Sequence, residues 1–172
     1  MAATDPLARV VVCDAGPLIH LDELGCLALF SDFARVLVPA SVWEEVSRHR
    51  PAALTGSNVA LEQSALVGPL PADLTGLGRL FALHQAELDA LHLARELEAD
   101  LLLTDDTAAR LAARQLSMPV HGTIGIVLRA IRRGQKSTAE VAGILRSLPD
   151  VSTLHIRQSL LDEIVREIEA GP

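Results

Sequence analysis

The stretch VVVCDAGPLI at residues 10–19 decides the fold, because an apolar run, an acidic residue and a turn follow one another directly in it. The apolar run, RVVVC at 9–13, is rich in β-branched side chains without polar alternation, which predicts a strand buried on both faces. Pro17 suits the first position of a helix, and the leucines and isoleucine that follow give this helix an apolar stripe. Asp14 is therefore expected between a buried strand and a helix.

The rest of the chain repeats this alternation of strands and helices. Apolar runs at 36–38 and 100–103 predict further buried strands, and weaker runs at 65–67 and at Val120 predict two more. The Pro, Gly, Ser and Asn residues of 51–60 favour a loop or an irregular helical link. The order predicts an α/β fold of βαβ units, with a mainly parallel sheet covered on both faces, in a single domain over residues 1–172. Helices are expected from 41 and at about 27–33, 72–82, 86–98, 107–116, 123–133, 138–147 and 158–169.

The composition limits both structure and function. Hydrophobic residues make up 49% of the 172 residues and aromatic residues 2%, so we expect an aliphatic core that needs no disulfides. Cys13 and Cys26 lack the spacing of metal ligands and are expected to be buried, reduced thiols. The net charge of −7 argues against coating nucleic acid through general electrostatics, although a metal cluster held by carboxylates attracts phosphate. Neither a signal peptide nor an apolar run of about 18 residues occurs, so we expect a soluble, cytoplasmic protein without a membrane span.

Acidic residues follow two of the predicted strands. Asp14 follows the first strand, and Asp105 and Asp106 follow the strand at 100–103. In an open parallel sheet, ligands bind outside the carboxyl ends of the strands, near the point where the strand order reverses. If these two strands are neighbours, we expect the carboxylates to meet at one edge of the sheet. Asp105 or Asp106 also suits the cap position of the next helix, which would leave the other for a ligand.

Further acidic residues lie near the starts of predicted helices. Ser41 and Glu44 have the spacing of a capping box, which gives Glu44 a structural role and leaves Glu45 for a site. Glu87 and Asp89 lie in the first turn of a later helix, where the helix dipole alone favours acidic side chains. For Glu87 we favour this structural interpretation.

Clustered carboxylates repel one another, which raises the pKa of some of them unless a cation binds. Mg²⁺ is a hard ion with oxygen ligands, and a few carboxylates, waters and substrate phosphates typically hold it. One or two such ions activate water and stabilise the leaving oxygen in phosphodiester cleavage. No His and Cys residues with zinc spacing compete for this role. The acidic residues therefore predict a Mg²⁺ or Mn²⁺ site.

Two of these segments resemble the opening motifs of the PIN-domain family. The first family motif, a strand followed by D-x-S/G-x-L-I, is matched by VVVCDAGPLI at 10–19. The second motif, an acidic residue on a helix that follows a strand and a proline, is matched by VLVPASVWEEV at 36–46. In that motif the acidic residue stands directly before an aliphatic position, which points to Glu45.

The later motifs follow in the same order, so that the resemblance covers most of the chain. The family's D-A-x-x-x-A is matched by LDALHLA at 88–94, which points to Asp89. Its L-L-T-x-D after a strand is matched by LLLTDD at 101–106, which points to Asp106. The stretch VHGTIGIVLRAIRRG at 120–134 is similar to one PIN-like branch, many of whose members are uncharacterised or accompany an antitoxin gene.

The resemblance implies a three-layer α/β/α sandwich and a divalent-metal-dependent ribonuclease. It implies that Asp14, Glu45, Asp89 and Asp106 hold one or two Mg²⁺ or Mn²⁺ ions, with Asp105 as a further candidate ligand, and that an activated water cleaves RNA. It also implies that the chain is the toxin of a toxin–antitoxin pair, with an antitoxin protein as partner. A homodimer is expected, with the C-terminal helices at about 138–169 packing on the domain or at the dimer interface.

Gly16 departs from the family pattern, because a Ser whose hydroxyl supports the metal site is common at this position. This departure and the net charge of −7 favour an alternative, a catalytically inactive PIN-like binding module. A phospho-acceptor receiver domain also gathers acidic residues at a sheet edge. That fold requires its acidic pair after the first strand, whereas Asp105 and Asp106 come late in this chain.

Other polar residues lie around the predicted helix at 123–133. Arg129, Arg132 and Arg133 form a basic cluster near its end, where the helix dipole stabilises cations without any partner. RNA phosphates are the alternative partners of this cluster. Thr123 opens the same helix as an expected N-cap, and we include it with Glu87 and Gly16 as a secondary site residue.

Overall fold

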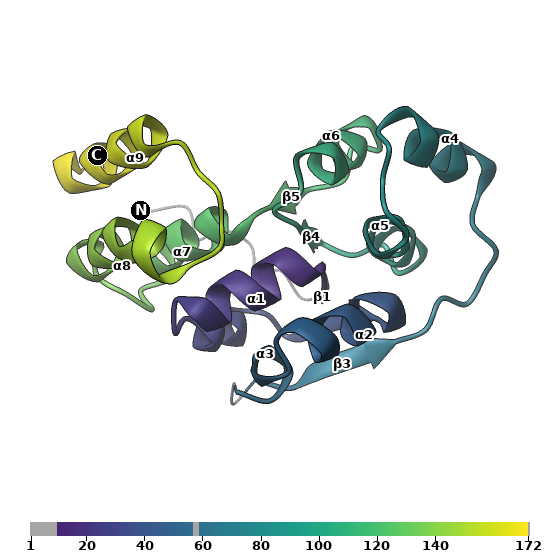
Figure 1. Ribbon diagram of the computed structural model, residues 1–172, viewed down its shortest axis with the longest axis horizontal. Coiled ribbons are helices and arrows are strands. Elements are labelled where there is room, and N and C mark those ends of the chain that lie inside the picture. The colour runs from purple at the N-terminus through teal and green to yellow at the C-terminus, as the bar shows by residue number, and fades with distance from the viewer. Residues whose placement is uncertain (1–9, 57–58, 172) are drawn as a thin grey trace.

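The computed structural model describes residues 10–56 and 59–171 and contains a five-stranded, entirely parallel sheet (Figure 1). The order of the strands is β3-β2-β1-β4-β5, so the chain first builds outward from β1 on one side and then returns to add strands on the other. The reversal falls between β1 and β4, where the two strands that precede the predicted acidic residues are neighbours. The strands are β1 (Val10–Cys13), β2 (Arg35–Pro39), β3 (Leu61–Ser64), β4 (Leu101–Leu103) and β5 (Val120–His121).

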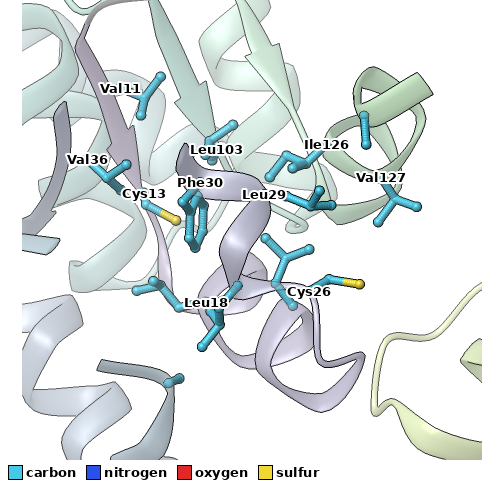
Figure 2. Close-up of a cluster of buried hydrophobic side chains, with 14 of the residues drawn as sticks. Val11, Cys13, Leu18, Cys26, Leu29, Phe30, Val36, Leu103, Ile126 and Val127 are labelled. Atoms are coloured by element: carbon cyan, nitrogen blue, oxygen red, sulfur yellow. The ribbon is translucent and has the colours of Figure 1, made fainter. Parts of the chain in front are cut away.

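Helices cover both faces of this sheet. Because side chains alternate along a strand, Val11 and Cys13 enter one core and Val12 enters the other. Phe30 lies in the first core among strand side chains and helix side chains (Figure 2). This core contains residues of α1 (Ala15–Glu23), the 3₁₀ helix η1 (Leu27–Asp32), α2 (Ala40–His49), α3 (Ala52–Thr55), α7 (Thr123–Arg132), α8 (Thr138–Val151) and α9 (Gln158–Ala170).

The second core lies on the opposite face, where α4 (Ala72–Leu80), α5 (Gln85–Glu96) and α6 (Thr107–Gln115) pack against the sheet. Its centre is aliphatic, with Leu74, Leu91 and Leu102 fully buried. Two helical layers therefore enclose a parallel sheet, which confirms the predicted three-layer α/β/α sandwich.

The C-terminal helices α8 and α9 contribute to the first core through Leu145, Leu161 and Val165. They pack against each other and, through α8, against α7 (Figure 1). These three apolar residues are thus used within the chain, and the predicted homodimer stays a prediction. Among the described helices, none has both the length and the apolarity needed to cross a membrane.

The predicted strand at 65–67 is wrong, because β3 is formed by Leu61–Ser64 instead. β3 is an edge strand paired with β2 alone, and its polar residue Glu62 binds Arg35 of β2 through two hydrogen bonds. An edge strand needs no continuous apolar run, so the apolar stretch misled the prediction, and Val67 is 91% exposed. Residues 1–9 and 57–58, on which parts of the predicted first strand, the signal-peptide assessment and the 51–60 link depend, lie outside the described residues.

Candidate active site

A cavity of about 410 Å³ opens at the carboxyl ends of β1 and β4, where the strand order reverses. Five acidic side chains from four different parts of the chain line it: Asp14 after β1, Glu45 of α2, Glu87 of α5, and Asp105 and Asp106 after β4. Among the described residues that form its walls, none is a lysine or an arginine. The structure therefore gathers negative charge at the place where parallel α/β sheets bind ligands.

Asp14 is the most deeply buried of these carboxylates, with 6% of its surface exposed. One of its oxygens accepts a hydrogen bond from the Ala15 amide at 2.8 Å and caps α1, and the other accepts from the Thr104 hydroxyl at 2.8 Å. Burial, with a smaller contribution from the charges of Glu87 and Glu45, raises the pKa of Asp14 to about 6 against the effect of these two hydrogen bonds. Its carboxylate is thus ionised with difficulty when no cation is near.

Glu45 lines the cavity from α2, although not for the reason that the capping-box spacing suggested. The predicted capping box is wrong: α2 begins at Ala40, one residue before Ser41, and Pro39 occupies the N-cap without a side-chain hydrogen bond. Glu44 is exposed to solvent, while Glu45 is half-buried and faces the cavity. The glutamate that the sequence left for a site thus lines the cavity, and the other was given a cap that does not form.

On α5, the structure places Glu87 at the cavity and directs Asp89 elsewhere, which reverses our prediction. Both oxygens of Asp89 accept hydrogen bonds, one from the Ser41 hydroxyl at 2.6 Å and one from the Gln85 amide at 2.7 Å. Positions two apart on a helix point about 200° apart, so these two side chains cannot share one site. Glu87 accepts a hydrogen bond from the His84 amide at 2.8 Å and so stabilises the helix start as well. Burial raises the pKa of Glu87, and the charges of Asp106 and Glu45 add to this.

The neighbouring Asp105 and Asp106 have different surroundings. Asp105 accepts hydrogen bonds from the Thr123 amide at 2.7 Å and the Thr123 hydroxyl at 2.6 Å, and its Oδ2 lies 2.7 Å from His20 Nδ1. Both of its oxygens therefore hold the start of α7 and the imidazole, while the side chain also lines the cavity, so its role as a metal ligand stays a prediction. Asp106 caps α6 with Oδ1, which accepts from the Ala109 amide at 2.7 Å, and it lines the cavity. We predicted that the residue that caps the helix would leave the other free for a ligand. Instead, Asp106 both caps α6 and lines the cavity.

Gly16 and Thr123, two of the predicted secondary residues, both lie next to Asp105. A Cβ atom at Gly16 would stand 3.1 Å from the Asp105 Cβ, so a serine at this position would crowd that side chain. Thr123 is fully buried and is the first residue of α7, where Gly122 is the N-cap, so the prediction of Thr123 as the cap is wrong by one residue. Both positions bear on the placement of Asp105.

The predicted RNA contacts need correction for two of the three arginines. Arg129 and Arg133 bind the two oxygens of Asp32 at 2.6 Å each, and the Arg129 guanidinium also lies over the Phe33 ring at 5.6 Å. Arg129 is 5% exposed, so it is part of the interior. Arg132 lines a groove between α7 and α9, away from the carboxylate cavity. The basic cluster in the sequence is therefore largely a structural ion-pair cluster.

Several residues of the cavity wall were missed by the sequence analysis. His20 and His84 lie on or beside helices that the sequence predicted, but a single histidine gives no signal of the direction in which it points. Leu154 and His155 line the cavity and belong to the connection between α8 and α9, whose path Figure 1 shows. Their position depends on the path of the last helices, which no local pattern contains.

The parallel α/β/α fold, with carboxylates gathered at the reversal of strand order, defines a class of α/β proteins that bind ligands at the carboxyl edge of the sheet. A family model described as a PIN domain, DUF3368, matches residues 10–170. The chain belongs to the PIN-domain family, whose members are typically nucleases.

A solved structure supports the fold. It is a PilT N-terminus domain protein from the hyperthermophilic archaeon Sulfolobus solfataricus, which is 16% identical and has a TM-score of 0.54. The match covers 72% of this chain and 94% of the archaeal chain. A comparison with curated proteins gives no match.

The site chemistry fits a loosely held divalent ion better than a tightly enclosed one. Among the described residues, no three His, Cys, Asp or Glu side chains stand close enough together to enclose a metal ion as they are. Mg²⁺, however, usually keeps several waters and takes only one or two carboxylates from a protein. An excess of buried carboxylate, with the pKa of Asp14 raised, is the environment that such an ion would neutralise.

Proposed function

We propose that this chain is a divalent-metal-dependent ribonuclease whose site is the carboxylate cavity. The observation that carries the proposal is the convergence of Asp14, Glu45, Glu87 and Asp106 on one cavity without a lysine or arginine in the described wall. A protein that places like charges together for stability alone would pair them with cations, as it does elsewhere. The unbalanced charge supports binding of Mg²⁺ or Mn²⁺ and, through the ion, of a phosphodiester.

The role that we propose for each residue follows from its surroundings. Asp14 and Asp106 are each fixed by a hydrogen bond to a backbone amide of a helix start and so present their carboxylates with little loss of entropy. Glu45 and Glu87 approach from two helices and complete the donor set. When bound, a divalent ion would activate a water molecule and stabilise the charge that develops on the leaving oxygen. Asp89 would keep α2 and α5 together through Ser41.

Cleavage of 5′-labelled single-stranded RNA in the presence of Mn²⁺ tests the proposal. We expect Asp14→Asn and Glu87→Gln to lower the cleavage rate at least about 100-fold, as is typical when charge stabilisation at a reacting phosphate is removed. Gln still accepts the hydrogen bond from the His84 amide, so Glu87→Gln preserves the helix start. Asp89→Asn and Glu44→Gln are matched controls on the same two helices and should retain cleavage within a few-fold of wild type.

Two results would overturn the proposal. Equal cleavage by wild type and Asp14→Asn would show that the activity comes from a contaminant. If calorimetry detects no Mn²⁺ binding at millimolar concentration, the chain is better described as an inactive binding module of the same fold.

The toxin role and an antitoxin partner form the finer part of the proposal. Induced expression of the wild-type chain in bacteria should arrest growth if it degrades cellular RNA, whereas expression of Asp14→Asn should not. Growth arrest by both variants, or by neither, would count against the toxin role and would leave the nuclease chemistry to the cleavage assay.

A further inference from the structure

We propose that a second cavity, of about 320 Å³ and adjoining the carboxylate cavity, binds the nucleotide next to the scissile phosphate, with Arg110 as the phosphate contact. This inference rests on the proposed function. Its volume is at the lower end of the range for small-molecule sites, about 300–1,000 Å³, and suits a single nucleotide. Arg110, Arg157, Ile124, Ile156 and Leu160 are among the residues that line it.

The two cavities form one continuous surface. Asp105, Leu154 and His155 line both of them, so a strand that lies in one passes directly into the other. Arg110 follows Asp106, the N-cap of α6, by four positions, so it lies about one helical turn beyond the cap. A phosphate near Asp106 therefore has its neighbouring nucleotide within reach of Arg110.

Arg110 differs from the other half-buried arginines of the chain in its partners. Within the described residues, its guanidinium makes no ion pair or hydrogen bond, whereas the half-buried Arg133 and Arg50 each bind a carboxylate, as does the buried Arg129. It lies at the cavity wall beside Gly122, with Nη1 3.6 Å from the position that a Cβ there would take. A partly buried guanidinium without a protein partner is well suited to donate two hydrogen bonds to an anion that presents a pair of oxygens, such as a phosphate.

The charges and apolar surfaces together select a nucleic acid strand. Arg110 and the exposed Arg157 put two positive charges around this cavity in a chain whose net charge is −7. Ile124, Ile156 and Leu160 offer an apolar surface for a base or ribose, and Leu160 is 39% exposed. An acidic peptide would also meet the arginines, but its next carboxylate would enter the acidic cavity and be repelled. A phosphodiester can enter that cavity together with a divalent ion.

The wall between the two cavities is held in place. Glu23 of α1 accepts hydrogen bonds from the Thr153 amide at 2.7 Å and the Ser152 hydroxyl at 2.8 Å. These bonds fix the connection between α8 and α9 just before Leu154 and His155. The cavity is therefore bounded by a tethered segment, which favours a defined path for the strand.

The experiment measures binding separately from cleavage. In an Asp14→Asn background, which keeps the RNA intact, fluorescence anisotropy gives the Kd of an eight-nucleotide single-stranded RNA for the parent and for added Arg110→Met. We expect Arg110→Met to raise Kd roughly tenfold and to reduce the slope of log K against log salt by about 1. Arg114→Met, one turn further along α6 on an exposed position outside both cavities, is the matched control and should change neither quantity.

The possible outcomes separate the two proposals. If wild type cleaves RNA but Arg110→Met binds it as tightly as Arg114→Met does, the subsite is overturned and the nuclease proposal stands. If wild type cleaves nothing but Arg110→Met alone weakens RNA binding, the subsite stands and the nuclease proposal fails. No RNA binding by the parent, or equal binding of an acidic peptide of the same length, overturns the subsite.

Discussion

The chain buries carboxylates in two regions, which differ in whether arginines neutralise them. Under α7, Asp32 is matched by Arg129 and Arg133, so that its charge is neutralised within the protein. At the carboxyl edge of the sheet, Asp14 and the acidic residues around it have no such counter-charge in the described wall of their cavity. The first arrangement is complete as it stands, and the second leaves room for a cation.

The difference separates a structural cluster from a candidate active site without reference to any motif. Buried charges normally persist only when they are paired or coordinate a metal. A region that violates this rule lowers stability, and such violations concentrate at functional sites. Charge balance therefore discriminates between regions better than the number of charged residues, which is high in both.

Removing the charge of Asp32, which is paired with two arginines, should have the largest effect on stability. Asp32→Asn removes the counter-charge of two guanidinium groups, of which Arg129 is 5% exposed, and leaves them buried with a neutral partner. We expect the free energy of unfolding to fall by about 3–5 kcal/mol, as when one partner of a buried ion pair is removed. Urea denaturation followed by circular dichroism measures this change.

Glu44→Gln provides the control for Asp32→Asn, because it also removes one negative charge but from an exposed position. It should change the free energy of unfolding by no more than about 0.5 kcal/mol. If Asp32→Asn costs less than 1 kcal/mol, the two clusters do not differ in the way that we describe.

Neutralising Asp14, in the region without counter-charges, should instead raise the free energy of unfolding. Asn at position 14 can accept from the Ala15 amide and donate to the Thr104 hydroxyl, so both contacts of Asp14 can be kept. The pKa of Asp14 is about 6, against an ordinary value of 3.8, which corresponds to a cost of up to about 3 kcal/mol for the ionised group at pH 7. In metal-free buffer, Asp14→Asn should therefore raise the free energy of unfolding, by up to about this amount.

The pH dependence gives an independent check on the same residue. Because the folded pKa is the higher one, the folded state binds more protons than the unfolded state between about pH 4 and pH 6, and wild type should lose stability as the pH rises through this range. Asp14→Asn should show a smaller loss over the same range in parallel urea titrations. Mn²⁺ should stabilise wild type more than the variant, since it binds the folded carboxylate. A variant that is less stable than wild type at pH 7 without metal would contradict the assignment.

The sequence was sufficient for the fold because the signal for it is repeated. Buried parallel strands need continuous apolar runs, and those of β1, β2 and β4 were recognisable at once, as were the helices between them. β3 was misplaced because an edge strand tolerates polar residues such as Glu62. Asp14, Glu45 and Asp106 were selected correctly for the cavity, since each position follows from the end of a strand or from a motif next to one.

The remaining site residues depend on contacts that no local pattern contains. Glu87 and Asp89 both lie near the start of α5, and only the presence of Ser41 on a neighbouring helix decides which carboxylate is already engaged. In the same way, Asp105 is distinguished from Asp106 by Thr123 and His20, which are distant in the sequence. The choice between Glu87 and Asp89, and the contacts that distinguish Asp105 from Asp106, were therefore beyond the sequence.

Gly122→Ala tests whether Asp105 is as firmly held as these contacts indicate. A Cβ at Gly122 would stand 2.5 Å from Asp105 Oδ1 and 3.3 Å from the Thr104 carbonyl oxygen, so the chain must shift. We expect a loss of about 1–3 kcal/mol, which is typical of overpacking. Gly143→Ala on α8 is the matched control, because a Cβ there meets nothing within 4 Å. It should leave stability unchanged or raise it by up to about 1 kcal/mol, since alanine favours helices. Thermal unfolding of both variants measures the contrast, and equal changes would contradict it.

Gly16→Ser should have the smallest effect on stability of the changes proposed here. It tests whether Asp105 is held firmly by its hydrogen bonds or belongs with the carboxylates that have no counter-charge. The new Cβ would lie 3.1 Å from the Asp105 Cβ, and hydrogen bonds to Thr123 and His20 prevent that side chain from moving away freely. We expect a loss of about 1 kcal/mol, or about 2–4 °C in Tm. In a double-mutant cycle with Asp105→Ala, most of this loss should disappear, because the crowded group is gone. If the two changes instead add independently, Asp105 gives way to the new Cβ, and it would have to be counted with the other carboxylates of the cavity as a candidate cation ligand.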